Sequence, residues 1–244
     1  MAWWLTLRGE FQQLLQLLLP AVCLFCQQRL PDGYPADRFC PDCLASLAPP
    51  TAARCSCCGV AFRGPSPTPH HCEACLRQPP PFARVHVLGA HQGLLREAVH
   101  RFKYREGLLL ARPLGQLLAE TVQNAWDGNA PDLLLPVPLH PDRLRRRGYN
   151  QALQLARQVG RQCGIPLAPA GLRRVRETTA QQGLAARQRH TNLRNAFEVT
   201  VPVAGRRLLL IDDVMTTGAT ARECAGVLRQ AGAVSVEVAV LGRA

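Results

Sequence analysis

The spacing of its cysteines constrains this chain more than any other feature of its sequence. Eight of the 11 cysteines form four C-x-x-C pairs, and the last two pairs repeat the first two at an offset of 32 residues. A C-x-x-C turn directs two thiolates at one tetrahedral ion, and a second turn on the returning arm of a hairpin completes the set. We therefore predict two structural zinc sites, with the ligands Cys23, Cys26, Cys40 and Cys43 in the first and Cys55, Cys58, Cys72 and Cys75 in the second.

A disulfide framework is the competing interpretation of these cysteines. Such frameworks are typical of secreted mini-domains, which are made with a signal peptide. The N-terminal residues fit a signal peptide poorly, because Arg8 and Glu10 lie within the apolar stretch and Val22 stands where a small residue is expected before a cleavage site. The sequence therefore favours zinc over disulfides.

The cysteine-rich segment 23–78 has too few large apolar side chains to fold around a hydrophobic core. Binding of zinc by thiolates contributes about 10–16 kcal/mol of folding free energy per site and can replace such a core. We expect a small double zinc ribbon over this segment. Cys57, His70 and His71 remain open as alternative ligands should one site be irregular.

The N-terminal segment 1–22 is apolar but interrupted by Gln12, Gln13 and Gln16. It is predicted to be an amphipathic helix that ends near Pro20, since proline cannot continue a helix. Its apolar run falls short of the roughly 20 residues that a membrane span requires. We expect no membrane span and a cytoplasmic protein.

The composition changes after the proline linker at 79–81, and a second domain is expected over 82–244. Buried-type strands alternate there with amphipathic helices, which argues for an α/β fold with a parallel sheet covered on both faces. Asn150 is a candidate N-cap for one of these helices. The expected strands are 83–90, 206–213 and 234–242, and 132–138 is a short apolar run bounded by prolines. The expected helices are 93–104, 110–126, 150–164 and 219–232.

The stretch LLLIDDVMTTGAT at 208–220 carries the strongest functional signal in this domain. Its aliphatic run is typical of a strand buried on both faces, and the carboxyl end of such a strand is where open α/β sheets bind ligands. Asp212 and Asp213 stand there and can accept hydrogen bonds from the two hydroxyls of a ribose. The following residues form a turn at a helix N-terminus that favours a 5′-phosphate: Thr216, Thr217, Gly218, Ala219 and Thr220.

Strand-end polarity with ordinary helix capping is the alternative explanation of this stretch. Neither the Walker loop nor the G-x-G-x-x-G dinucleotide fingerprint occurs in the chain. The stretch resembles the motif that binds 5-phosphoribosyl 1-pyrophosphate (PRPP) in type I phosphoribosyltransferases. The chain as a whole resembles the ComF family, whose members join an N-terminal double zinc ribbon to such a domain.

This resemblance extends to FKYREG at 102–107, LPVPLHPDRLRRRGYNQA at 135–152 and TTAQQGLAARQRHTNLRNAF at 178–197. One departure is Met215, in a place where the family often has an aromatic residue. The resemblance implies a type I phosphoribosyltransferase fold, with a parallel sheet flanked by helices, preceded by a small double zinc ribbon. It also implies a mobile loop at 181–189 that closes over PRPP.

The resemblance further implies roles for individual residues. Asp212, Asp213 and Lys103 would be the catalytic residues, and Mg²⁺ would be bound together with PRPP, held chiefly by PRPP oxygens and water. Arginines suit the dianionic leaving group because each can donate two parallel hydrogen bonds. The expected pyrophosphate-binding residues are Pro138, Arg145, Arg146, Arg147, Gly148, Asn150 and Gln151.

The formal net charge of +12 suits an anionic partner but does not identify one. A solvated basic face, or a coding bias toward arginine, would give a similar charge. Three hypotheses follow. The chain is a phosphoribosyltransferase with an unidentified acceptor, a non-catalytic module that responds to PRPP or nucleotides, or, as the resemblance implies, an accessory protein of DNA uptake in natural competence that binds single-stranded DNA or a competence helicase. The oligomeric state stays open.

Overall fold

The computed structural model describes residues 20–244 with some gaps: 32, 36–37, 49–52, 63, 65–67, 105–106, 127, 129 and 176–195. The chain divides into two compact units, Met1–Ser46 and Leu47–Ala244. The helix expected within residues 1–22 lies almost entirely outside the described residues. In the part of the chain that is described, no helix has both the length and the apolar character needed to cross a membrane.

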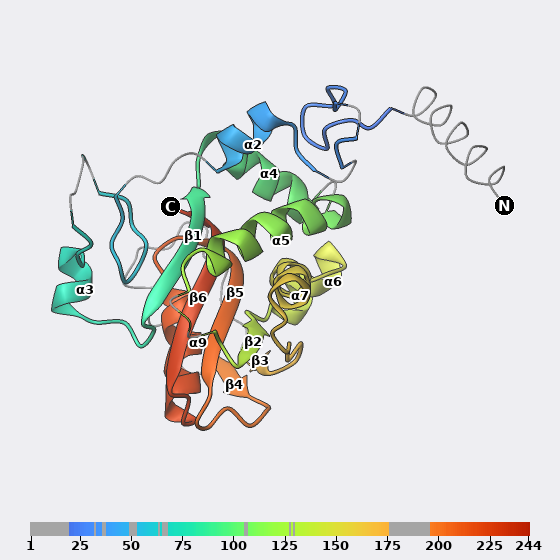
Figure 1. Ribbon diagram of the computed structural model, residues 1–244. Coiled ribbons are helices and arrows are strands. Elements are labelled where there is room, and N and C mark those ends of the chain that lie inside the picture. The colour runs from blue at the N-terminus through green and yellow to red at the C-terminus, as the bar shows by residue number, and fades with distance from the viewer. Residues whose placement is uncertain are drawn as a thin grey trace, which may run out of the picture. The chain divides into compact units, whose positions relative to one another are not determined.

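A four-stranded parallel sheet organises the larger unit (Figure 1). The expected strands and their parallel pairing are confirmed. Because all four strands run in the same direction, their carboxyl ends meet at one edge of the sheet. In spatial order the strands are β1 (Arg84–Ala90), β6 (Ser235–Arg243), β5 (Arg207–Met215) and β2 (Leu133–Pro136).

Helices cover both faces of this sheet, as a run of aliphatic strands requires. Alternate residues of β5 face opposite sides. Leu208 and Leu210 belong to the apolar cluster that includes α9, whereas Leu209 and Ile211, also fully buried, lie outside that cluster. Figure 1 places α9 on one side and α5 and α7 on the other. The helices are α4 (Gly93–Tyr104), α5 (Gly107–Gln123), α7 (Gln151–Cys163) and α9 (Ala219–Gln230).

Local sequence signals set the ends of α7. The side chain of Asn150 accepts a hydrogen bond from the amide of Ala152 at 3.0 Å, which confirms the expected N-cap. Gly164 ends the helix in the left-handed conformation, with φ of 69°. Leu155, Ala156 and Val159 on the buried face of α7 have no exposed surface. The cap and the apolar face together explain why this segment is a helix at this place.

A second, two-stranded antiparallel sheet was not anticipated from the sequence. It pairs β3 (Leu172–Arg174) with β4 (Phe197–Val199). Three residues per strand are too few for an alternating pattern to stand out. The loop expected at 181–189 lies between these strands but outside the described residues.

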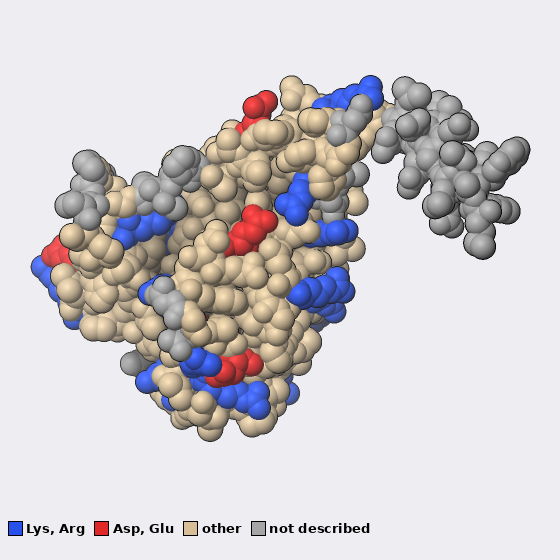
Figure 2. Space-filling view, viewed as in Figure 1, with Lys and Arg blue, Asp and Glu red and all other residues tan. Residues whose placement is uncertain are grey.

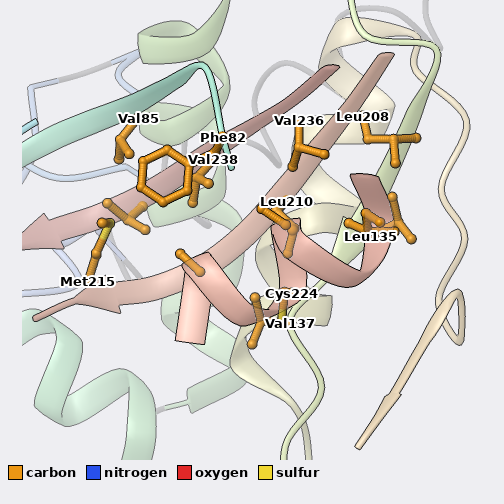
Figure 3. Packing of buried hydrophobic residues seen from close by; sticks show 14 of the residues in the cluster. Phe82, Val85, Leu135, Val137, Leu208, Leu210, Met215, Cys224, Val236 and Val238 are labelled. Atoms are coloured by element: carbon orange, nitrogen blue, oxygen red, sulfur yellow. The ribbon is translucent and has the colours of Figure 1, made fainter. Parts of the chain in front are cut away.

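The two cysteine-rich halves belong to different compact units. The first contains α2 (Pro41–Leu47), which ends where the units divide, and the second contains α3 (Glu73–Arg77). The second half shares a hydrophobic core with the sheet: Cys57, Cys58 and Cys75 belong to the same buried cluster as the residues at the edge of the sheet. In Figure 3, Phe82, Val85, Val238 and Met215 pack together in that cluster. A domain boundary at 79–81 remains a prediction.

Candidate functional site

The turn between β5 and α9 lies at the carboxyl edge of the sheet. Gly218 precedes the first helical residue, Ala219, and adopts the left-handed conformation with φ of 79° and ψ of 7°. A Cβ atom at Gly218 would lie 2.5 Å from Cε of Met215, so the side chain of Met215 packs directly beneath the turn. Glycine is required here both by the backbone conformation and by this close packing.

The backbone amides of this turn are open to a ligand. Within the described part of the chain, the amides of Thr216, Thr217, Gly218 and Thr220 have no hydrogen-bond partner. The amide of Ala219 makes only a long bond, 3.4 Å, to Oγ1 of Thr217. These residues, with Asp212, line a cavity of about 50 Å³. Unpaired amides at the positive end of a helix dipole form an anion-binding site, so the five residues predicted to bind a 5′-phosphate lie together at one site.

Asp212 and Asp213 point to opposite sides of β5, because successive side chains of a strand alternate. Asp212 lines the cavity of the turn. Asp213, on the other side, forms an ion pair with Lys103 of α4, with 3.2 Å between Nζ and Oδ2. Of the three residues that were expected to be catalytic, the structure therefore brings Asp213 and Lys103 into contact and places Asp212 on the opposite side of the strand.

The pKa of Asp212 is raised to about 7. Burial is the main cause, and the neighbouring charge of Asp213 adds to it. The amide of Asp213, which donates to Oδ1 of Asp212 at 2.8 Å, acts in the opposite direction but more weakly. One of the two carboxyl groups therefore retains a proton to a higher pH than an exposed carboxyl would.

A larger cavity, of about 440 Å³, begins at Lys103. It is lined by Arg146 and Arg147 of helix α6 (Pro141–Arg147) and by Tyr104 and Tyr149. In Figure 2, Lys and Arg side chains gather along the side of the molecule where Figure 1 places α6 and α7. The last turn of α6 carries three consecutive arginines. The cavity thus presents cationic groups beside the carboxyl edge of the sheet.

Contacts on both sides hold Arg147 in place at this cavity. Its guanidinium donates to Oε1 of Gln151 at 3.1 Å and to the hydroxyl of Tyr104 at 3.2 Å, and it stacks 5.1 Å from the centre of the Tyr104 ring. Tyr149 donates a hydrogen bond to the carbonyl of Phe102 and so ties α4 to the segment after α6. The sequence analysis gave no role to Tyr104 or Tyr149, although both lie within the quoted stretches that resemble the family.

The other expected pyrophosphate-binding residues have different surroundings. Arg145 stands apart from the cavity: its side chain is 78% exposed and pairs with Asp142 at 3.0 Å. Gln151 is buried beside Arg147, and its Nε2 has no partner in the described part of the chain. Asn150 donates to the carbonyl of Val137 at 3.0 Å and so fixes the segment after β2, which includes the half-exposed Pro138. Gly148 ends α6 in the left-handed conformation, with φ of 78°.

Each cysteine quartet forms one cluster. In both, the four Sγ atoms lie within 4.8 Å of one another. Sγ of Cys26 lies 3.6 Å from that of Cys40, and the equivalent pair in the second quartet, Cys58 and Cys72, has the same separation. Four sulfurs at 2.3 Å from a tetrahedral zinc ion would be ~3.8 Å apart. The chain therefore has two tetracysteine zinc-binding sites, closed by four protein ligands and hence structural.

Backbone amides prepare one thiol of each quartet for metal binding. Burial alone would raise the pKa of Cys23 and of Cys55, but three backbone amides donate toward each sulfur, and the pKa of both falls to about 6. The shortest of these contacts are 3.3 Å from Cys40 to Cys23 and 3.2 Å from Cys72 to Cys55.

The alternative ligands considered from the sequence lie outside both clusters. The thiol of Cys57 is directed toward the carbonyl of Phe82, at 3.9 Å, and the ring of His70 stacks on Phe62 with 4.0 Å between the ring centres. His71 is exposed. The two quartets need none of these side chains to complete a tetrahedral set.

Two family models match this chain: "Double zinc ribbon domain" over residues 14–76 and "Phosphoribosyl transferase domain" over residues 105–243. "Competence protein F" of Haemophilus influenzae is 37% identical over 180 residues, covering 71% of this chain and 79% of that protein. "DNA utilization protein YhgH" of Salmonella typhimurium is 34% identical over 230 residues, covering 93% of this chain and 99% of that protein. Among solved structures, the glutamine PRPP amidotransferase of B. subtilis complexed with ADP and GMP is 22% identical, with 59% of this chain and 30% of that chain covered and a TM-score of 0.40.

Proposed function

Because this chain belongs to the family that joins a double zinc ribbon to a phosphoribosyltransferase domain, we propose that it binds PRPP or a related ribose phosphate together with Mg²⁺. The observation that carries the proposal is the turn Thr216–Thr220, which borders a cavity beside Asp212 and in which four of the five amides have no partner in the described part of the chain. These amides would donate to the 5′-phosphate, and the hydroxyls of the threonines would add further donors.

The aspartates would bind the ribose ring. Asp212 lies at the cavity of the turn, and Asp213 pairs with Lys103, which lines the larger cavity, so the two carboxyl groups are suited to accept hydrogen bonds from hydroxyls of the sugar. Lys103 balances the charge of Asp213. Asp212 has a raised pKa and would hold a proton that it can donate to a ligand oxygen near neutral pH.

The larger cavity would receive the pyrophosphate. Arg146 and Arg147 line it, and Arg147 is already oriented by Tyr104 and Gln151, so that little side-chain freedom remains to be lost on binding. When bound with PRPP, Mg²⁺ would neutralise part of the charge of the pyrophosphate oxygens. The contribution of Gln151 would be indirect, because its Oε1 accepts a hydrogen bond from Arg147 and so holds that guanidinium at the cavity.

The reaction that such a site serves is phosphoribosyl transfer. The bond between C1 of the ribose and the pyrophosphate oxygen breaks, and its electron pair leaves with pyrophosphate. A nucleophilic atom of the acceptor forms the new bond to C1 and releases a proton. The protein would contribute positioning and charge neutralisation and no covalent nucleophile. The acceptor is not identified by the residues of the site. Binding of PRPP without any product would favour the non-catalytic, ligand-responsive alternative.

Two relatives bear names connected with competence and with the utilization of DNA. These names support a role of this chain in DNA uptake, and we propose that it acts there in the cytoplasm. A direct contact with single-stranded DNA is a second candidate function. It is favoured by the exposed arginine side of α6, where the side chain of Arg145 is 78% exposed. A competence helicase is a further candidate partner.

Thermal unfolding with and without ligand tests the proposed function. PRPP with Mg²⁺ at about 100 times its dissociation constant should stabilise the chain by about 2.7 kcal/mol and raise its melting temperature. The double variant Asp212→Asn, Asp213→Asn should lose this increase, because it removes both carboxylates of the ribose site.

Asp132→Asn is the matched control. Asp132 is an aspartate at the amino end of the sheet, where it pairs with Arg207 at 2.9 Å, so its variant should keep the full ligand-induced increase. Absence of any increase in the parent protein would reject binding of PRPP, and with it the assignment of the turn as a phosphate site.

A further inference from the structure

One arginine joins the phosphate turn to the second tetracysteine site. The guanidinium of Arg243, at the end of β6, donates from Nε to the carbonyl of Cys58 at 3.1 Å. From Nη1 it donates to the carbonyl of Met215 at 3.2 Å and to that of Thr216. Cys58 belongs to the second quartet, and Met215 and Thr216 begin the turn. A single cation therefore bridges a zinc-ligand turn and the candidate phosphate-binding turn.

The two carbonyls in the phosphate turn belong to the peptide groups whose N–H bonds should point at the anion. The carbonyl of Met215 shares its peptide plane with the amide of Thr216, and the carbonyl of Thr216 shares its plane with the amide of Thr217. In a planar trans peptide the C=O and N–H bonds point in opposite directions. The amide of Ala244 also donates to the carbonyl of Met215 at 3.1 Å, whereas the carbonyl of Thr216 is held by Arg243. By holding both carbonyls on one side, Arg243 helps to turn both amides to the other side, where they have no partner in the described part of the chain.

The carbonyl of Cys58 in turn depends on its metal-binding turn. The amide of Cys58 donates to Sγ of Cys55 at 3.4 Å, and the amide of Gly59 donates to the carbonyl of Cys55 at 3.0 Å. The conformation of the turn is thus organised around the Cys55 thiolate. Without the metal, the four thiols lose the ion that holds them together, and little else stabilises this arrangement.

Apolar packing and a second hydrogen bond reinforce this connection. Met215, which packs beneath Gly218, belongs to the same buried cluster as Cys58. On α9, just beyond the turn, Arg222 donates to the carbonyl of Gln78 at 3.3 Å. Gln78 caps α3, the short helix that carries Cys75. The second tetracysteine half is therefore hydrogen-bonded to Arg243, which holds the start of the phosphate turn, and to Arg222, two residues beyond its end.

We infer that Arg243 is a positioning residue that aligns the amides of Thr216 and Thr217, so that the state of the second tetracysteine site sets the affinity for a ribose phosphate. The inference rests on the proposed function of the turn. The first quartet lies in the other compact unit and provides a natural comparison. The second zinc site would thus act on ligand binding as well as on folding.

The direct test compares Arg243→Gln with Arg229→Gln. Arg229 also donates to two backbone carbonyls, those of Ala233 and Val234, but at the far end of α9. The first readout, NMR relaxation of the Thr216 and Thr217 amides, needs no ligand. Their order parameters should fall from about 0.85 to below about 0.6 in Arg243→Gln and should stay at the parent value in Arg229→Gln. Unchanged order parameters in Arg243→Gln would overturn the inference.

The second readout is calorimetric binding of ribose 5-phosphate. Arg243→Gln should bind about tenfold more weakly than the parent, the loss expected when charge-assisted hydrogen bonds no longer preorganise the site. Arg229→Gln should bind as the parent does. Equal affinity in the parent and Arg243→Gln would contradict the inference, whereas a parent that fails to bind would contradict the proposed function and leave the NMR result to decide the role of Arg243.

The zinc sites are compared with one ligand variant in each quartet, Cys58→Ala and Cys43→Ala. Native mass spectrometry should find one zinc ion fewer in each variant than in the parent. Only Cys58→Ala should reproduce the effects of Arg243→Gln, namely lower order parameters of the Thr216 and Thr217 amides and weaker binding of ribose 5-phosphate. If both variants, or neither, show these effects, zinc at the second site has no specific influence on the turn. Should Cys58→Ala not fold, the arginine variants still decide the role of Arg243.

Discussion

Asp212 and Asp213 are adjacent in sequence but take different environments. Asp213 has a cationic partner, Lys103, whereas Asp212 faces the cavity of the turn between β5 and α9 and has a pKa raised to about 7 by burial and by the charge of Asp213. The folded pKa of Asp212 is thus above its unfolded value of about 3.9. Its contribution to stability is fully present below about pH 4 and is lost as the pH rises through about 7.

The raised pKa of Asp212 predicts that the free energy of unfolding depends on pH through this one carboxyl group. Between about pH 4 and pH 8, the free energy of unfolding of the parent should fall by up to about 4 kcal/mol relative to that of Asp212→Asn. Urea unfolding across this range measures the difference. Asp132, whose pKa is lowered to about 2 by hydrogen bonds from Arg207, should show no such trend when changed to Asn, because it is ionised throughout the range. A pH-independent difference for Asp212→Asn would contradict the raised pKa.

At the scale of a single element, the turn between β5 and α9 depends on one glycine. Gly218→Ala should lower the free energy of unfolding by about 1–2 kcal/mol, because a Cβ atom disfavours the left-handed conformation and collides with Met215. It should also weaken binding of ribose 5-phosphate, since relief of the collision would move the amides of the turn.

Gly226 of the same helix supplies the control. It lies in the interior of α9, and in the described part of the chain a Cβ atom there would meet no atom within 4 Å apart from the neighbouring backbone of its own helix. Gly226→Ala should therefore stabilise the chain by about 0.5–1 kcal/mol, as alanine does in a helix, and should leave ligand binding unchanged. Chemical unfolding and calorimetry of the two variants test the difference. Equal effects of the two substitutions would mean that the conformation of the turn is not critical.

For the whole molecule, the formal net charge of +12 predicts electrostatic attraction to nucleic acid. If single-stranded DNA binds along α6, its affinity should fall steeply with added salt, and Arg145→Glu should reduce the logarithmic salt slope by about 0.7 or more, the value for one lost phosphate contact. Fluorescence anisotropy with a labelled oligonucleotide over a salt series measures this slope.

Arg77→Glu is the matched control for DNA binding. Arg77 is as exposed as Arg145, at 79%, and is likewise paired with an acidic side chain one helical turn away, that of Glu73. It lies in the second cysteine-rich half and should leave the salt slope unchanged if contact is made through α6. An equal loss in both variants would point to a diffuse attraction, and binding insensitive to salt would contradict an electrostatic contact altogether.

The sequence by itself determined the features that depend on short-range stereochemistry. Cysteine spacing specified both metal quartets, the aliphatic run of β5 specified a buried parallel strand, and Asn150 specified the start of α7. The roles of the predicted site residues remain predictions. Residues 181–189 lie outside the described residues, and the strands β3 and β4 were missed because they are too short to carry a pattern.

Tertiary structure alone decided which distant residues meet. The ion pair of Lys103 with Asp213, the stacking of Arg147 on Tyr104 and the bridge from Arg243 to Cys58 join segments far apart along the chain. Such contacts depend on strand order and on the packing of helices across the sheet, neither of which is encoded in a local pattern. For this reason the arginine-rich stretch could be identified from the sequence, but its individual arginines could not be distinguished. Only the fold shows that Arg147 lines the cavity and that the side chain of Arg145 is exposed to solvent.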